Sequence, residues 1–419
     1  MVDISNNFCG IKSPNPFWLA SAPPTDKQYN VERAFEAGWG GVVWKTLGDP
    51  IVNVSSRYAS IDYAGRRLAG LNNIELITDR PLEVNLREIR DVKKNWPDRA
   101  VIVSLMVESK REVWHEMVKR AEDTGADGLE LNFGCPHGMS ERGMGSAVGQ
   151  VPDYVCNITE WVKEVAQTPV IVKLTPNISD VRWPARAAKK ANADAVSLIN
   201  TINSVMGVDL KTFIPRPIVG DSSAHGGYCG PAVKPIALNM ISSIANDPET
   251  MHLPISGIGG VSTWQDAVEF LLLGSTNVQV CTAVMHHGFR IVEDMIDGMK
   301  NWMRENNFNK LEDFIGLSSS RVKDWGNLNL NYKVVANINQ DKCIKCGLCY
   351  IACEDASHQA ISYTKTASAK KFEIIEQECV GCNLCELVCP VQDCITMDER
   401  NQDKPFMNWS EYQKQVLGR

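Results

Sequence analysis

Two runs of cysteines near the C-terminus constrain this chain more than any other feature of its sequence. The first run, Cys343–Cys353, reads C-I-K-C-G-L-C-Y-I-A-C, and the second, Cys379–Pro390, reads C-V-G-C-N-L-C-E-L-V-C-P. Both have the spacing C-x2-C-x2-C-x3-C, in which three cysteines hold one [4Fe–4S] cluster and the fourth holds the neighbouring cluster. We therefore predict two clusters in one small folded unit that carries electrons singly.

The spacing rule assigns eight cysteines to two ligand sets. They are Cys343, Cys346, Cys349 and Cys389 for one cluster, and Cys379, Cys382, Cys385 and Cys353 for the other. Two zinc sites are the alternative, but zinc needs four ligands per site and has no use for a cysteine exchanged between runs. One departure from the pattern is Glu354, where a proline would follow the first run. Because Cys353 and Cys389 are exchanged, we expect loss of either to damage both clusters.

Bulk composition indicates an ordinary globular protein. The 419 residues are 44% apolar and 22% charged, which is enough for a large catalytic domain and a small module. The net charge of −7 gives no electrostatic reason to bind nucleic acid or an anionic membrane. Six cysteines are scattered outside the runs, which favours reduced thiols and a cytoplasmic location. No export signal and no apolar stretch of 18 residues occurs, so we expect neither secretion nor a membrane span.

Short β-rich segments alternate with amphipathic helical segments before the cysteine runs. The predicted strands are Phe17–Ser21, Gly41–Lys45, Val101–Leu105, Gly128–Asn132, Val170–Leu174, Ala195–Asn200, Ile255–Ile258 and Val278–Cys281. The predicted helices include Val31–Ala37, Arg111–Asp123, Asp153–Ala166, Asp180–Ala191 and Trp264–Leu273. Eight such βα units in about 300 residues fit a TIM (β/α)8 barrel. A doubly wound sheet could use the same alternation.

Polar residues at the predicted strand ends favour the barrel, because a barrel builds its active site at the C-terminal ends of its strands. These residues are Ser21, Lys45, Asn132, Lys173, Asn200 and the pair Gly259–Gly260. The segment Gly257–Gly260 suits a phosphate site, since backbone N–H groups at a loop before a helix bind anions. It is not a dinucleotide fingerprint, because the third glycine of G-x-G-x-x-G is missing.

The segment Leu129–Gly149 is the most unusual outside the cysteine runs. Glycines at 134, 138, 143, 145 and 149 predict a loop over the site that closes on the substrate. Cys135 lies on this loop, and an ordinary thiol is mostly protonated at neutral pH, so Cys135 could donate a proton. A nucleophilic role is the competitor and would need a base, for which His137 is the local candidate; we expect His137 to be a bystander.

The predicted domains follow from these patterns. Residues 1–310 form the barrel, 311–337 a turn-rich linker, 338–400 a small α+β unit of the bacterial ferredoxin type with two [4Fe–4S] clusters, and 401–419 a polar tail.

A series of short motifs in the barrel resembles the FMN barrel of the dihydroorotate and dihydropyrimidine dehydrogenases. The motifs are A-S-A at 20–22, W-K-T at 44–46, G-L-N-N-I-E-L-I at 70–77, N-F-G-C-P-H-G at 132–138, V-K-L-T-P-N at 172–177, I-N-T at 199–201, G-G-Y-C-G at 226–230, G-I-G-G at 257–260 and Q-V-C-T at 279–282. With the two cluster runs appended, the likeness is to the NAD-dependent, pyrimidine-reducing branch of that family and covers nearly the whole chain.

The resemblance implies roles for individual residues. FMN contacts would come from Ser21, Lys45, Thr46, Lys173, Gly230, Gly259, Gly260, Cys281 and Thr282, and pyrimidine contacts from Asn73, Glu75, Asn132, Asn200 and Thr201. Cys135 matches the general acid. Gly134 stands where some relatives have serine, which implies one substrate hydrogen bond fewer. The implied reaction reduces uracil or thymine to the 5,6-dihydropyrimidine, reversibly, with hydride from FMN and a proton from Cys135.

The electron source is implied to be a second protein. No Rossmann fingerprint occurs in the sequence, so an FAD- and NAD-binding partner subunit would pass electrons through the two clusters, in a hetero-oligomer. Two alternatives stay open. One is a dihydroorotate dehydrogenase, whose carboxylated substrate Glu75 would repel if it points into the pocket. The other is an iron–sulfur electron carrier with a non-catalytic barrel, which leaves the polar strand ends unexplained.

Overall fold

The structure, a computed structural model, describes residues 2–48, 52–63, 66–136, 143–356, 358–366, 370–400 and 403–418. The chain forms two compact units, Met1–Val322 and Lys323–Arg419. Among the helices of these described residues, none is both long enough and apolar enough to cross a membrane.

Eight parallel strands close into a barrel in the first unit, with neighbours in the order β3, β4, β7, β8, β9, β10, β13, β14. Their bounds are β3 Phe17–Leu19, β4 Gly41–Leu47, β7 Ala100–Leu105, β8 Gly128–Asn132, β9 Val170–Lys173, β10 Ala195–Leu198, β13 Ile255–Ile258 and β14 Asn277–Val280. The TIM barrel expected from the sequence is thus confirmed, and a doubly wound sheet is wrong. Every residue of these strands is buried, as in parallel sheets covered on both faces.

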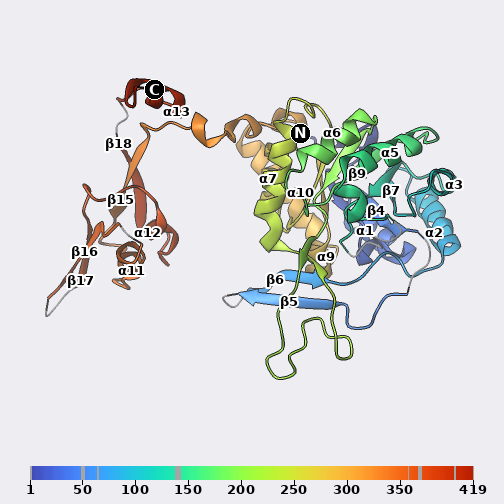
Figure 1. Ribbon diagram of the computed structural model, residues 1–419, viewed down its shortest axis with the longest axis horizontal. Helices are drawn as coiled ribbons and strands as arrows, with labels where there is room; N and C mark the ends of the chain where they lie inside the picture. The colour runs from blue at the N-terminus through green and yellow to red at the C-terminus, as the bar shows by residue number, and fades with distance from the viewer. Residues whose placement is uncertain are drawn as a thin grey trace. The chain divides into compact units, whose positions relative to one another are not determined.

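Helices surround the strands in the first unit (Figure 1). They are α1 Gln28–Ala37, α2 Leu82–Asn95, α3 Arg111–Glu122, α4 Ser146–Gly149, α5 Pro152–Lys163, α6 Arg182–Lys190, α7 Lys234–Ala245, α8 Trp264–Leu272, α9 Thr282–His287 and α10 Ile291–Glu305. Helix α8 shows how the sequence sets a boundary. The hydroxyl of Thr263 accepts from the backbone N–H of Asp266, whose carboxylate accepts from the backbone of Thr263, so both ends of a capping box are made.

The barrel interior is apolar near the beginnings of the strands and polar near their ends. Apolar side chains from five strands pack there with Phe8 and Ile11, which come from the hairpin of β1 (Asn6–Phe8) and β2 (Ile11–Ser13). Phe8 contacts Trp18 edge to face, with ring centroids 5.7 Å apart. The next layer holds buried polar side chains, namely Ser104, Glu130, Lys173, Ser197, Ser256 and Gln279.

A second sheet, not predicted from the sequence, is built from excursions of the barrel loops. Its antiparallel order is β11, β12, β6, β5, with bounds β5 Tyr58–Tyr63, β6 Arg66–Asn73, β11 Ile202–Ser204 and β12 Gly226–Cys229. Figure 1 shows the β5–β6 hairpin at one end of the barrel. Pairing of β12 with β6 joins segments more than 150 residues apart, so Asn73 lies opposite Gly227.

Single-turn 3-10 helices follow the barrel. They are η4 Leu311–Asp313, η5 Ser319–Arg321 and η6 Trp325–Asn327. Leu311 and Phe314 are fully buried in the core of the first unit, where the ring of Phe314 lies 5.0 Å from that of Trp302. Folded structure therefore extends into the segment 311–337.

The second unit contains two antiparallel strand pairs and short helices. Its elements are β15 Lys333–Ile338, α11 Leu348–Glu354, β16 Ile361–Lys365, β17 Lys370–Ile374, α12 Leu384–Leu387, β18 Ile395–Arg400 and α13 Trp409–Gln415. Strand β15 pairs with β18, and β16 pairs with β17. Each of the helices α11 and α12 begins inside one cysteine run. In α13, the ring of Trp409 packs against Trp325 at 5.8 Å, so part of the segment 401–419 is folded.

Candidate functional site

One cavity lies at the C-terminal ends of the barrel strands, and about 1060 Å³ of empty space, part of it open to solvent, is found there. Every residue that the sequence predicts for the FMN, pyrimidine and acid sites lines it. These residues are Ser21, Lys45, Thr46, Asn73, Glu75, Asn132, Cys135, Lys173, Asn200, Thr201, Gly230, Gly259, Gly260, Cys281 and Thr282. The fold thus brings together residues that are as much as 261 positions apart in the sequence.

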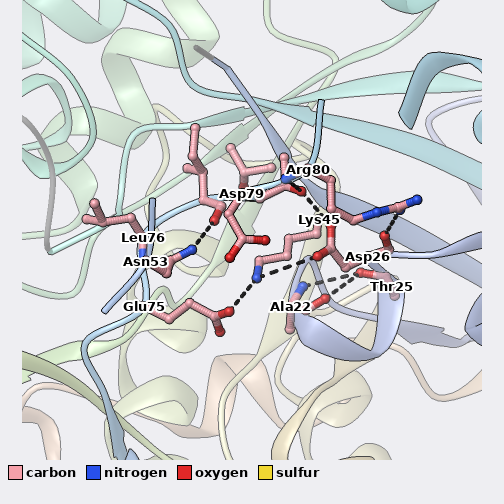
Figure 2. A network of polar contacts seen from close by, with 12 residues as sticks. Ala22, Thr25, Asp26, Lys45, Asn53, Glu75, Leu76, Asp79 and Arg80 are labelled. Carbon is pink, nitrogen blue, oxygen red and sulfur yellow. Dashed lines mark hydrogen bonds and ion pairs between the residues drawn. The ribbon is translucent and has the colours of Figure 1, made fainter. Parts of the chain in front are cut away.

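Two lysines at the cavity are paired with buried carboxylates. Lys45 Nζ lies 2.7 Å from Glu75 Oε1 and 3.9 Å from Asp26 Oδ2, and Figure 2 shows the ammonium between these two carboxylates. Lys173 Nζ lies 3.5 Å from Glu130 Oε1. Burial is the main cause that raises the pKa of Asp26, while the ammonium of Lys45 opposes it. Each lysine charge at the cavity is therefore balanced by an acid of the protein itself.

A row of hydrogen bonds links residues at or just beyond the C-terminal ends of four barrel strands at the cavity. Thr46 Oγ1 is 3.1 Å from Ser21 Oγ and accepts from Asn132 Nδ2 at 3.0 Å. Asn132 Oδ1 accepts in turn from Asn200 Nδ2 at 2.9 Å, and Asn200 Oδ1 accepts from the backbone N–H of Thr201 at 2.8 Å. These bonds fix how both amide groups are turned. An amide NH2 has two donors, so each asparagine has a second N–H to offer a ligand.

Glycine backbone forms another part of the cavity wall. Gly259 and Gly260 have φ values of +128° and +79°, where side chains are strained. A Cβ at Gly260 would also lie 2.9 Å from the carbonyl oxygen of Gly230, so these loops approach closely only because they carry glycine. Loop backbone that lines the cavity together with two lysines is the donor set that suits an anionic, phosphate-bearing cofactor. The residues present therefore fit FMN.

Cys135 is 6% exposed and lies just beyond the end of β8. Its backbone carbonyl accepts from the N–H of Ser146 at 3.0 Å, which ties it to the start of α4. A Cβ at the preceding Gly134 would lie 2.5 Å from the Cβ of Asn200, so the serine of some relatives would need a rearrangement here. His137, considered as a base for Cys135, lies outside the described residues, as does the loop segment 137–142.

Several residues that line the cavity were not predicted as site residues from the sequence. Tyr58 lines the cavity, and its hydroxyl donates to Glu75 Oε2 at 2.8 Å. Burial and the carboxylate of Glu75 raise the pKa of the Tyr58 phenol, so the hydroxyl keeps its proton. Gln279 and Tyr228 also line the cavity. A signal existed for Gln279, which is a polar residue inside the buried run V-Q-V, and for Tyr228, which stands in the motif G-G-Y-C-G, whereas Tyr58 had none.

Cys281 differs from an ordinary reactive thiol. It lines the cavity at the start of α9, and burial raises the pKa of its thiol to about 11. Its sulfur lies 3.8 Å from the sulfur of Met285. Cys281 therefore stays a neutral thiol at physiological pH and can act as a donor or as packing surface only.

The second unit holds two smaller cavities, each lined by four of the predicted ligands. Cys353, Cys379, Cys382 and Cys385 line one of them, and Cys343, Cys346, Cys349 and Cys389 line the other. Each set thus takes three cysteines from one run and the fourth from the other. Within the described ranges, no three His, Cys, Asp or Glu side chains converge on one metal-ion position. The four sulfurs surround a space instead, as a cluster requires.

The two runs wrap their cavities with the same backbone turns. Lys345 and Gly347 in the first run have positive φ, and Gly381 and Asn383, at the corresponding positions of the second run, also do. A ninth cysteine, Cys394, was not assigned a role from the sequence. It is buried and also lines the cavity of the first run, where its sulfur lies 3.7 Å from the carbonyl oxygen of Asn339.

Comparison with known families gives two matches. Residues 4–303 match the dihydroorotate dehydrogenase family, and residues 336–397 match the 4Fe-4S dicluster domain. A crystal structure of a dihydroorotate dehydrogenase from Eimeria tenella, in complex with ferulenol, superposes with a TM-score of 0.61. That match covers 75% of this chain and 88% of the other at 18% identity, and it supports the fold.

Curated relatives are similar over long stretches. The NAD-dependent dihydropyrimidine dehydrogenase subunit PreA of Escherichia coli (strain K12) is 42% identical over 87% of this chain and 88% of that protein. The chloroplastic dihydropyrimidine dehydrogenase (NADP(+)) of Arabidopsis thaliana is 44% identical over 75% of this chain and 77% of that protein. The catalytic subunit of dihydroorotate dehydrogenase B (NAD(+)) of Pyrococcus abyssi is 38% identical over 74% of this chain and 98% of that protein.

Proposed function

The chain belongs to the dihydroorotate dehydrogenase family, and from that premise we propose that it is the catalytic subunit of an NAD-dependent dihydropyrimidine dehydrogenase. As a CH–CH oxidoreductase, it would reduce uracil or thymine to the 5,6-dihydropyrimidine, reversibly. The extent of the matches carries the proposal. The dihydropyrimidine dehydrogenase subunit aligns with 87% of this chain. The dihydroorotate dehydrogenase aligns over 98% of its own length and still leaves about a quarter of this chain unmatched.

FMN is the cofactor of this family, and it supplies hydride when bound. Lys45, Lys173, Ser21, Thr46 and the loops at Gly230, Gly259–Gly260 and Cys281–Thr282 would hold it, since all line one cavity. Backbone N–H groups of the glycine loops suit its phosphate. The two ammonium groups line the same cavity and would offer positive charge to a reduced, anionic ring.

Pyrimidine recognition would fall to the amides and the carboxylate at the cavity. Asn132 and Asn200 are held by their mutual hydrogen bond, and each can present one N–H to a ring carbonyl oxygen. Thr201, Asn73 and Glu75 line the same wall. Such fixed donors would stabilise the negative charge that develops on a ring oxygen during reduction.

Cys135 would deliver the proton to ring carbon C5. Its thiol lines the cavity and is almost fully buried, so bulk water does not compete with it as an acid. In the reverse reaction the same sulfur would take the proton back.

The C-terminal unit would hold two [4Fe–4S] clusters through the eight cysteines of its two cavities. These clusters supply one-electron exchange when bound. A partner subunit with FAD and an NAD site is proposed because the sequence contains no dinucleotide fingerprint and because the Escherichia coli relative is named a subunit. We also propose a cytoplasmic hetero-oligomer, on the ground that the scattered cysteines suit a reducing compartment.

Anaerobic purification followed by an absorbance spectrum and three assays tests the proposal. With an artificial reductant, uracil and thymine should be consumed and orotate should not. Turnover of orotate without uracil would instead make the chain a dihydroorotate dehydrogenase. A protein that binds clusters but no flavin would be an electron carrier.

A further inference from the structure

The segment 53–58 is joined to the segment 74–79 by a short series of hydrogen bonds at the edge of the cavity. The side chain of Asn53 accepts from the N–H of Leu76 at 2.8 Å and donates to the carbonyl of Ile77 at 3.0 Å. Figure 2 shows Asn53 beside Leu76, with Glu75 reaching to Lys45. The backbone N–H of Ile74 donates to the carbonyl of Arg57 at 3.0 Å. Arg57 is therefore held next to the cavity wall.

Arg57 bridges two carboxylates of that wall. Its Nη1 lies 2.7 Å from Glu75 Oε1 and its Nη2 lies 3.1 Å from Asp79 Oδ2. Its Nε donates to the carbonyl of Val54 at 2.9 Å, so all three arms of the fork are used. The Arg57 side chain is 30% exposed, whereas Glu75 is 7% exposed. Arg57 thus reaches from the surface to a carboxylate inside the cavity.

The donors around Glu75 leave a specific acceptor position. Oε1 accepts hydrogen bonds from Lys45 Nζ and from Arg57 Nη1, each at 2.7 Å, and these two bonds use both of its lone pairs. Oε2 receives the hydroxyl of Tyr58 at 2.8 Å. A carboxylate oxygen has two lone pairs, so Oε2 can accept one more N–H. Glu75 and Tyr58 both line the cavity, which places that remaining position at the ligand site.

We propose that Arg57 is a positioning residue for substrate recognition: it holds Glu75 so that Oε2 accepts an N–H of a neutral pyrimidine and repels a carboxylated one. The inference rests on the proposed function and deepens it. Without Arg57, Glu75 would keep only Lys45 on Oε1 and could turn towards that ammonium. Oε2 of Glu75 would then leave the position in which it can accept from the ring N–H, although the negative charge of Glu75 would stay in the cavity.

The test compares Arg57→Gln and Arg57→Lys with a matched control in the full chain loaded with FMN. Arg186→Gln is the control, because Arg186 also bridges two carboxylates, Asp247 and Glu249, and is 35% exposed, yet does not line the cavity. The measurements are kcat and KM for uracil with an artificial reductant, and Kd for uracil and for orotate from the flavin absorbance of the oxidised protein. Flavin content and thermal unfolding report on the fold.

In Arg57→Gln, KM and Kd for uracil should rise about tenfold, the worth of one hydrogen bond to a charged group, with kcat within about twofold. Arg57→Lys keeps the charge but not the fork, and should recover part of that loss. Arg186→Gln should leave both constants unchanged. Glu75→Gln should weaken the binding of uracil about tenfold. It should strengthen the binding of orotate, since Lys45 and Arg57 then lack their counter-charge.

Failure of the inference can be told from failure of the proposed function. If the unaltered chain does not reduce uracil, the proposed function fails. If it does, and Arg57→Gln leaves KM and Kd for uracil within twofold while Glu75→Gln raises them, only the role of Arg57 is overturned. Equal losses in Arg57→Gln and Arg57→Lys, accompanied by lower flavin content and a lower unfolding temperature, would show that Arg57 serves the fold and would also overturn the inference.

Discussion

The carboxylate of Glu130 lies 3.5 Å from the ammonium of Lys173 inside the barrel, and Glu130 itself is fully buried. Its second oxygen accepts from Ser197 Oγ at 2.8 Å and from Gln279 Nε2 at 3.3 Å. One acid from β8 thus joins β9, β10 and β14 directly below the cavity. Burying both charges costs desolvation free energy, which the attraction between them offsets. When one partner is removed, the other charge stays buried without its counter-charge.

Glu130→Gln should therefore destabilise the FMN-free chain by about 3 kcal/mol, because Lys173 would remain buried without its counter-charge. Urea unfolding followed by tryptophan fluorescence measures the effect. The double variant Glu130→Gln/Lys173→Met should recover part of the loss, since the two residues interact directly. An unchanged unfolding midpoint in the single variant would show that the pair contributes nothing.

Cys135→Ala should keep FMN and both clusters but lose turnover of uracil by a factor of about 10²–10⁴, the usual contribution of a general acid. Steady-state rates measured beside flavin and iron contents separate chemistry from folding. Cys156→Ala is the matched control, because Cys156 is another buried cysteine of the barrel unit but does not line the cavity. Normal turnover in Cys135→Ala would refute the assignment of the acid.

Cys281 should resist iodoacetamide at pH 8 in the FMN-free chain. Its pKa of about 11 leaves about one thiolate in a thousand at that pH. Because the folded chain raises this pKa, the protonated thiol favours the folded state below pH 9, and this contribution to stability is lost as the pH rises towards 11. Mass mapping of the peptide that carries Cys281 should show modification only as the pH approaches 11. Rapid modification at pH 8 would contradict the buried, neutral thiol.

Cys353→Ser and Cys389→Ser should each remove at least about four of about eight irons per chain, because each residue belongs to the set centred on the other run. Iron and sulfide analysis of anaerobic protein measures the loss, while flavin content should be unchanged. Cys394→Ala should keep all the iron, since Cys394 also lines this cavity but stands outside the four-cysteine set that the spacing assigns. If Cys394→Ala lost iron and Cys389→Ser retained it, Cys394 and not Cys389 would be the fourth ligand of that cluster.

Both ends of every barrel strand were predictable to within two residues, because a strand buried on both faces is a short apolar run bounded by turns in the sequence. Strands β8 and β13 have the predicted bounds, Gly128–Asn132 and Ile255–Ile258. The second sheet was missed, since Tyr58–Tyr63 has no continuous apolar run and β6 pairs with a strand far away in the sequence. Local patterns carry no information on such pairing.

In the candidate site, too, some features could be predicted from the sequence and others could not. Residues at strand ends and in recognisable motifs were predictable, because the barrel geometry brings those ends together. The ion pairs among them were not, since neither spacing nor composition indicates that Arg57 reaches Glu75. A signal for Glu130 did exist: a charged residue between the leucines of a buried strand requires a partner.

The two halves of the barrel interior differ in what a substitution there would report. The hairpin residues Phe8 and Ile11 pack with Trp18 in the apolar layer, where the indole N–H of Trp18 donates to the hydroxyl of Ser13 at 3.0 Å, so changes at Phe8 or Ile11 would alter mainly the melting temperature. In the polar layer nearer the cavity, changes at Ser197 or Gln279 would also disturb the carboxylate of Glu130, to which both side chains donate. Stability and substrate preference could therefore be selected independently in one library, by randomising the apolar layer and the polar layer of the barrel interior separately.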